Sequence, residues 1–218
     1  MYQRPLAKLL WYEFLRVVCR AAAVAIYRIR CRGREFIPVT GGVLVIANHQ
    51  SHLDPVLIGI ACDRRLNYLA RESLFRFPPF RWLIYSLDGI PIDRDGMGMA
   101  GLKETLRRLK REEMVVIFPE GTRTFDGELS PLKPGFSALA RRAAVPLLPV
   151  AVEGAFDAWP RTANMPRPGI IEVQFGAPLM PAETAALDDR ELVAEMQRRL
   201  KACLDAARAQ RNARLGSR

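Results

Sequence analysis

The sequence predicts a single α/β domain in which a mixed central sheet is flanked by helices and preceded by an N-terminal amphipathic helical segment. A chain of 218 residues has room for one domain of ordinary size. Short runs rich in valine and isoleucine alternate with longer amphipathic stretches, which is typical of a buried sheet with helices between its strands. Apolar residues make up 50% of the chain and charged residues 26%, which excludes a disordered or collagen-like protein.

The apolar runs are the expected strands. Val43 to Ala47 is the clearest of them. Further strands are expected at residues 67–70, 90–92, 114–118, 147–152 and 170–175. Helices are expected at residues 55–62, 80–87, 99–110 and 136–143, and in a long terminal stretch from about residue 189 to residue 211.

The N-terminal segment combines positive charge with an apolar stripe. The whole chain has a net charge of +10, and residues 1–34 hold eight basic residues against Glu13 alone, a net of +7. Only seven residues separate Arg20 from Arg28, far fewer than the roughly 20 needed to cross a bilayer. We therefore expect residues 1–32 to associate with an anionic membrane surface without spanning it, and residues 33–218 to form the folded domain. Alternatively, this helix packs its stripe on the domain and keeps its charges in water.

The four cysteines indicate neither a metal site nor a disulfide framework. They are scattered along the chain, with no close pair and no neighbouring histidine. We expect no metal and no cofactor. The positive charge alone also suits nucleic acid, but the sequence shows no nucleic-acid-binding module or basic patch interleaved with aromatic residues, so no nucleic-acid partner is expected.

Both histidines lie in one short segment directly after the first expected strand. The segment is Asn48-His49-Gln50-Ser51-His52-Leu53-Asp54-Pro55. Because residues five apart on an ideal helix are separated by about 140°, His49 and Asp54 meet only if His49 lies in the turn before the helix. An imidazole that accepts a hydroxyl proton, held by a carboxylate at its other nitrogen, activates an oxygen nucleophile. Alternatively, Asp54 is a helix N-cap before Pro55 and His49 is an ordinary turn residue.

Two further segments place charged side chains after apolar strands. The first is Gly89-Ile90-Pro91-Ile92-Asp93-Arg94, whose arginine suits a two-pronged contact with phosphate, although a surface pair with an aspartate is the simpler interpretation. The second is Phe118-Pro119-Glu120-Gly121-Thr122-Arg123-Thr124, with Lys133-Pro134-Gly135 following it. It offers a carboxylate, a glycine that permits close backbone approach, and two donors. A turn closed by a pair between Glu120 and Arg123 is the alternative.

In this order and spacing, the segments resemble the glycerolipid acyltransferase superfamily, and most closely the 1-acylglycerol-3-phosphate O-acyltransferases. The likeness covers roughly residues 33–154. Besides the His-x4-Asp motif, the segment ending at Arg94 and the Pro-Glu-Gly-Thr-Arg motif, it includes Gly33-Arg34-Glu35-Phe36-Ile37-Pro38, Ala70-Arg71-Glu72-Ser73-Leu74-Phe75 and Val145-Pro146-Leu147-Leu148-Pro149-Val150.

The resemblance implies a role for each matching residue. His49 is expected to be the general base and Asp54 its orienting partner. The residues expected to bind the acceptor and shape its phosphate pocket are Arg94, Glu120, Gly121, Thr122, Arg123 and Arg71. Arg71 stands where the family usually has lysine. An arginine there keeps the positive charge but changes its geometry.

The activity implied by the resemblance is acyl transfer in phospholipid biosynthesis. A fatty acyl group passes from an acyl-CoA or acyl carrier protein thioester to the sn-2 hydroxyl of lysophosphatidic acid, giving phosphatidic acid, and the enzyme is expected as a peripheral or monotopic protein on the cytoplasmic face of a membrane. Other acceptors stay open: glycerol-3-phosphate, another lysophospholipid or a lyso-aminolipid. A non-enzymatic basic lipid-binding module is the alternative from a different class.

Overall fold

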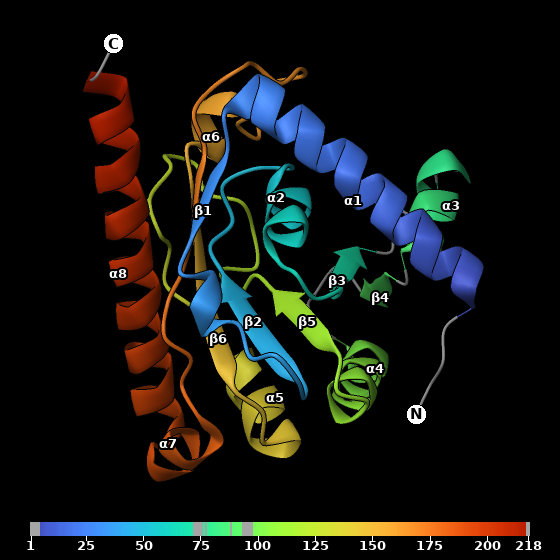
Figure 1. The fold of residues 1–218 in the computed structure, drawn as a ribbon. Coiled ribbons are helices and arrows are strands. Elements are labelled where there is room, and N and C mark those ends of the chain that lie inside the picture. Colours follow the sequence, from blue (N-terminus) through green and yellow to red (C-terminus); the bar gives the residue numbers. More distant parts are fainter. Residues whose placement is uncertain (1–4, 72–75, 77, 88, 93–97, 217–218) are drawn as a thin grey trace.

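The computed structural model describes residues 5–71, 76, 78–87, 89–92 and 98–216 (Figure 1). Its strands are β1 (Arg30–Arg32), β2 (Val43–Ala47), β3 (Leu66–Arg71), β4 (Ile90–Ile92), β5 (Met114–Ile117), β6 (Leu147–Glu153) and β7 (Glu172–Phe175). Its α-helices are α1 (Leu6–Tyr27), α2 (Asp54–Ala61), α3 (Pro78–Ser86), α4 (Met99–Lys110), α5 (Gly135–Ala143), α6 (Ala155–Ala158), α7 (Pro181–Ala186) and α8 (Asp189–Gly216), and a short 3-10 helix covers Arg34–Phe36.

Among the described residues the strands form one seven-stranded sheet in the order β1-β7-β6-β2-β5-β3-β4. All neighbouring strands run parallel except β6 and β7, which are antiparallel. The predicted α/β domain with a mixed sheet, flanking helices and a preceding N-terminal helix is therefore confirmed.

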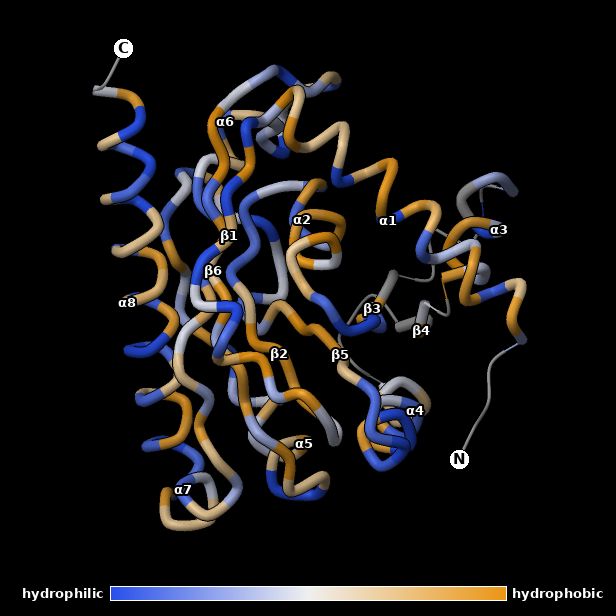
Figure 2. The backbone as a smooth tube through the Cα atoms, in the orientation of Figure 1, coloured by the Kyte–Doolittle hydropathy of each residue, from blue (hydrophilic) through white to orange (hydrophobic). Residues whose placement is uncertain are grey.

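The sheet is covered by helices on both faces, so the domain has three layers (Figure 1). Val43, Val45 and Ala47 of β2 pack with residues of α1 and α2, and the intervening Leu44 and Ile46 pack with residues of α4, α5 and α8. Every residue of β2, β5 and β6 is buried. Parallel strands buried on both faces are apolar along most of their length, which explains why β2 and β5 are unbroken apolar runs in the sequence and why β6 is apolar until Glu153 (Figure 2).

Helix α1 is only partly buried by this domain. Tyr12, Ala23 and Tyr27 face inward, while other large apolar residues of α1 stay exposed. The orange stretches along α1 in Figure 2 include this uncovered surface. No helix in the described ranges combines the length and apolarity required to cross a membrane.

The sheet has one strand that the sequence did not predict, and its last strand begins later than expected. Residues 30–32 are Arg-Cys-Arg, whose polarity hides the strand, yet β1 pairs in parallel with β7. Ile171 bonds to the backbone around the α1–β1 connection: its N–H donates to the Tyr27 carbonyl, and its own carbonyl accepts from the N–H of Arg30. Strand β7 itself starts at Glu172.

The terminal helix α8 runs to Gly216, beyond the expected end near residue 211. Leu192, Met196 and Leu200 place its apolar side against the sheet. The last turns of α8 carry Arg211 and Arg214. Their guanidinium groups bond to carboxylates on β6, on β7 and on α6. Such partners, more than forty residues away along the chain, extend the helix past the point where apolar spacing alone would end it.

Two glycines test how closely the turn after β1 packs on β7. Gly33 and Gly41 both have left-handed backbone conformations, with φ values of 73° and 78°. A Cβ atom on Gly33 would lie 2.1 Å from the carbonyl oxygen of Phe175, whereas nothing lies within 4 Å of one on Gly41. We expect Gly41→Ala to lower the free energy of unfolding by about 1–2 kcal/mol, the cost of the left-handed conformation, and Gly33→Ala to lower it clearly more. Urea denaturation of both variants measures this, and equal losses would contradict the predicted backbone clash.

Candidate active site

The candidate site lies where neighbouring parallel strands end. Strand β2 is hydrogen-bonded to β5 on one side and to β6 on the other, all in parallel. The chain therefore leaves Ala47, Ile117 and Glu153 at the same edge of the sheet. In open α/β sheets this edge is where ligands usually bind. The segments carrying His49 and the Pro-Glu-Gly-Thr-Arg motif start there.

His49 and Asp54 meet at this edge. The Nδ1 atom of His49 lies 2.8 Å from Oδ2 of Asp54, whose side chain is fully buried. The same Oδ2 accepts the backbone N–H groups of Gln50 and Ser51, each at 2.7 Å. With Nδ1 held by a carboxylate, Nε2 is the ring nitrogen left to accept a proton.

Asp54 does not act as a conventional helix cap. It is the first residue of α2, with Pro55 at the start of the helix, but the helix has no side-chain capping hydrogen bond. The carboxylate instead points back into the preceding turn, where it binds the amides of Gln50 and Ser51. This places His49 in the turn before the helix, as the spacing required.

The backbone and ring of His49 are fixed by the loop that follows β5. Its ring stacks on that of Phe118, with centroids 4.2 Å apart and an interplanar angle of 22°. The N–H of His49 donates to Oε1 of Glu120 at 2.6 Å, and its carbonyl accepts from the N–H of Thr124 at 2.8 Å. The His49 segment and the Pro-Glu-Gly-Thr-Arg motif are thus joined by direct hydrogen bonds, although His49 and Glu120 are 71 residues apart in the sequence.

Glu120 is a largely buried carboxylate that binds two backbone amides. Its Oε1 accepts from His49, and its Oε2 accepts from the N–H of Ser130 at 2.9 Å. Burial raises the pKa of this carboxyl above its usual value, while the two amide hydrogen bonds act in the opposite direction. Both oxygens are directed at the protein backbone, so Glu120 shapes the site by joining two loops.

Gly121 and Lys133 lie against one another beside Glu120. Gly121 has φ of 74°, and a Cβ added to it would lie 2.6 Å from the Nζ atom of Lys133. The N–H of Lys133 donates to the carbonyl of Pro119 at 2.9 Å, which fixes the start of its side chain. No role was predicted for Lys133 from the sequence, although its place shortly after the Pro-Glu-Gly-Thr-Arg motif was an available signal.

Arg123 lies near the histidine loop. Partial burial lowers the pKa of His52, and the positive charge of Arg123 lowers it further. The ring of His52 also lies 5.2 Å from that of Trp159. His52 therefore lies beside the site, and Thr122 is exposed on its rim.

The remaining two predicted residues are Arg71 and Arg94. Arg71 is the last residue of β3, where its backbone pairs with Ile92 of β4. Because β3 runs parallel to β5, Arg71 stands at the same edge of the sheet as His49. Arg94 lies outside the described residues.

Comparisons with known proteins agree with this architecture. A 1-acyl-sn-glycerol-3-phosphate acyltransferase of Pseudomonas aeruginosa is 32% identical over 204 residues, which cover 92% of this chain and 76% of that protein. One from Bacillus subtilis is 28% identical over 169 residues, covering 77% of this chain and 82% of the relative. The crystal structure of a 1-acyl-sn-glycerophosphate acyltransferase from Thermotoga maritima matches with a TM-score of 0.80 and 25% identity, over 93% of this chain and 82% of that one.

The family assignment follows from these matches together with a family-wide comparison. The sequence model described as Acyltransferase matches residues 28–153, which is 126 of the 218 residues. The resemblance predicted from the motifs is confirmed, and the chain belongs to the acyltransferase family.

Proposed function

We propose that this chain transfers a fatty acyl group from a thioester, carried by coenzyme A or acyl carrier protein, to the sn-2 hydroxyl of lysophosphatidic acid and so forms phosphatidic acid. The observation that carries the proposal is the 2.8 Å contact between Nδ1 of His49 and the buried carboxylate of Asp54. The relatives from P. aeruginosa and B. subtilis are named for 1-acyl-sn-glycerol 3-phosphate, which supports this acceptor.

In the proposed reaction, His49 acts as a general base. Its Nε2 accepts the proton of the acceptor hydroxyl as that oxygen attacks the thioester carbonyl. The Asp54 carboxylate holds Nδ1 and stabilises the imidazolium that forms. The tetrahedral intermediate then collapses with cleavage of the C–S bond, and the imidazolium returns its proton to the departing thiolate. The acyl group thus moves directly from sulfur to oxygen.

The cations beside the Glu120 loop are proposed to bind the acceptor's phosphate. Arg123 offers a planar group for a two-pronged contact, and Lys133 adds a compact charge over Gly121. Arg71 at the end of β3 stands at the same edge, and the family resemblance adds Arg94. Glu120 and Gly121 would shape this pocket and Thr122 its rim.

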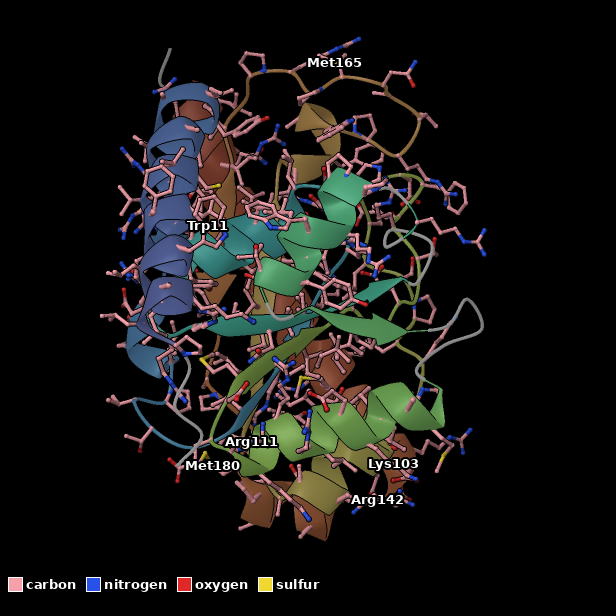
Figure 3. All side chains as sticks on the ribbon, turned by 90° about the vertical axis from the view of Figure 1, so that its right-hand side faces the viewer. Trp11, Lys103, Arg111, Arg142, Met165 and Met180 are labelled. Atoms are coloured by element: carbon pink, nitrogen blue, oxygen red, sulfur yellow. The ribbon has the colours of Figure 1, made fainter. Side chains whose placement is uncertain are left out.

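We also propose that residues 1–32 associate with an anionic membrane surface on its cytoplasmic side, while residues 33–218 form the catalytic domain. The partner is a lipid surface because the uncovered residues are apolar and the segment is basic. Trp11 donates its indole N–H to Ser86 at 3.0 Å and packs on Trp82 with ring centroids 5.4 Å apart, so α3 extends this surface (Figure 3). The exposed apolar residues of α1 and α3 are Leu6, Leu9, Leu10, Phe14, Val17, Val18, Val24, Ile26, Trp82 and Tyr85.

His49→Ala is expected to lower kcat by about 10²–10⁴-fold without unfolding the protein, because it removes the general base. His52→Ala is the matched control and should keep most of the turnover, since His52 lies beside the site without the Asp54 contact. Both are measured with lysophosphatidic acid and an acyl thioester, with circular dichroism as the check on folding. Near-normal turnover in folded His49→Ala would exclude this mechanism.

Arg123→Ala and Lys133→Ala should each raise the KM for lysophosphatidic acid by about tenfold or more, because each removes a charge-assisted contact. The KM for the acyl thioester should change little. Arg142→Ala, on the exposed surface of α5 (Figure 3), is the control for loss of one positive charge. Equal increases for both substrates would indicate a structural role, and assays with glycerol-3-phosphate and other lysolipids identify the acceptor.

Replacing Leu10, Phe14 and Val17 together by glutamine should weaken binding to liposomes that contain anionic lipid. These residues are 62%, 58% and 64% exposed, so the change removes apolar surface without opening the core. High salt should weaken the binding of the unmodified protein but not abolish it, since only the electrostatic part is screened. Co-sedimentation measures both effects, with Val39→Gln, at an exposed site after the 3-10 helix, as control. Undiminished binding of the triple variant would place the membrane contact elsewhere.

A further inference from the structure

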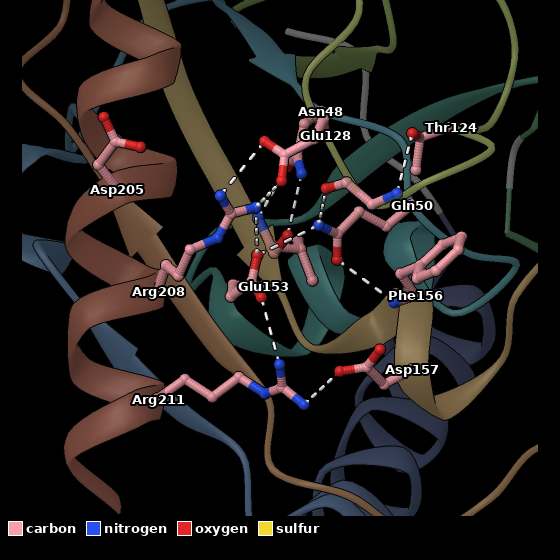
Figure 4. A network of polar contacts seen from close by, with 12 residues as sticks. Asn48, Gln50, Thr124, Glu128, Glu153, Phe156, Asp157, Asp205, Arg208 and Arg211 are labelled. Carbon is pink, nitrogen blue, oxygen red and sulfur yellow. Dashed lines mark hydrogen bonds and ion pairs between the residues drawn. The ribbon is translucent and has the colours of Figure 1, made fainter. Parts of the chain in front are cut away.

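Both neighbours of His49 are attached to the end of β6. The side chain of Asn48 donates to the carbonyl of Val152 at 2.9 Å and accepts from its N–H at 2.8 Å. The side-chain amide of Gln50 donates to Oε2 of Glu153 at 3.3 Å (Figure 4). The position of His49 along the chain is therefore set from both sides by the last two residues of one strand.

Gln50 is the more elaborate of the two attachments. Its side-chain nitrogen also donates to the carbonyl of Gly127 at 2.9 Å, and its side-chain oxygen accepts from the N–H of Phe156 at 3.3 Å. Its own backbone N–H donates to Asp54. One buried amide thus links residues 48–51, the catalytic turn, to the loop after β5, to β6 and to α6.

The Glu153 carboxylate at the centre of this network is compensated by the C-terminal helix. It is only 6% exposed, and a carboxylate removed from water needs a cation or donors to remain charged. Arg211 approaches Oε1 at 3.3 Å, and Arg208 lies 3.7 Å from Oε2 (Figure 4). Both arginines come from the last third of α8.

The two arginines are themselves held in place by other groups. Arg211 also donates to Asp157 at 2.5 Å and to the carbonyl of Ile170 at 3.0 Å, and Arg208 pairs with Glu128 at 3.0 Å. Glu128 follows directly after Gly127, which accepts from Gln50. The arginines of α8 therefore contact two groups next to the partners of Gln50 or among them: Glu128 and Glu153.

We propose that α8 positions the catalytic turn: Arg208 and Arg211 hold Glu153, and Glu153 holds Gln50 next to His49. Glu153, Arg208 and Arg211 are positioning residues, because they act on His49 through Gln50 and touch no reacting atom. The proposal rests on the proposed function of His49 as the base. A displacement of about 1 Å in a reacting group costs on the order of 10²-fold in rate, so loss of this support should appear in turnover.

Glu153→Gln is the central variant because it keeps the size of the side chain and removes its charge. We expect kcat to fall by about 10–100-fold while KM for both substrates stays within about twofold, since the phosphate-binding cations are untouched. Arg198→Gln is the matched control: it removes an exposed arginine of the same helix that pairs with Glu195 within α8. It should keep the full kcat.

Arg208→Gln and Arg211→Gln give a second route should Glu153→Gln fail to fold. Arg208 is one-third exposed, so its replacement leaves the core intact. Each should lower kcat, Arg211→Lys should recover part of the loss, and Arg211→Gln combined with Glu153→Gln should lose much less than the two effects multiplied. An unchanged kcat in the folded Arg208→Gln and Arg211→Gln proteins would contradict the proposal. Where Glu153→Gln also folds, independent, multiplying effects on kcat would contradict a common action through Glu153.

A readout without substrate separates this inference from the proposed activity. The chain has only two histidines, so ¹⁵N-imidazole NMR gives two sets of signals, which His52→Asn assigns. Glu153→Gln should shift or broaden the His49 signal, and Arg198→Gln should not. If the folded Glu153→Gln protein kept both its kcat and its His49 signal, α8 would only pack on the sheet and the inference would fail. If the unmodified protein acylated no lysolipid but Glu153→Gln still changed the His49 signal, the proposed function would fail and the positioning role would stand.

Discussion

The parallel pairing of β2 with both β5 and β6 is the constraint on which the rest of the structure depends. It sets Ile46 opposite Ile117 on one side and Pro149 on the other. Three strand ends consequently lie side by side, and the polar residues that follow or end them meet without long connecting loops. The hydrogen bonds of His49 to Glu120 and of Gln50 to Glu153 are direct results of this register.

Three buried carboxylates turn that arrangement into a rigid site. Asp54 Oδ2 accepts from two amides and contacts an imidazole, Glu120 accepts from two amides, and Glu153 is bound by an amide side chain and two arginines. Leaving a buried charge without its partners costs several kcal/mol, so the loops cannot move apart freely. Groups held in this way need little reorganisation during a reaction, which is how preorganised polar sites lower barriers.

The parts of this structure that could be predicted from the sequence are those encoded locally. Strands β2, β5 and β6 appear as apolar runs, and the five-residue spacing of His49 and Asp54 required the turn that is found. Strand β1 was missed because Arg-Cys-Arg has no apolar pattern and pairs with β7, which lies some 140 residues away along the chain. The support of Gln50 by α8 was missed for the same reason: Arg211 and Glu153 are 58 residues apart, and no local pattern connects them.

Helices α1 and α8 cover opposite faces of the sheet and differ in what their outer residues contact. Helix α1 leaves large apolar residues uncovered, and a lipid surface would replace water there in the proposed function. Helix α8 instead places its last arginines in ion pairs around Glu153, Asp157 and Glu172. The side-chain hydrogen bonds described for residues 48–51 run to β6, α6, the loop after β5 and Asp54, and none of those described reaches α1. Helix α1 therefore meets the catalytic turn by apolar packing through α2, which begins with Asp54, and not through these hydrogen bonds.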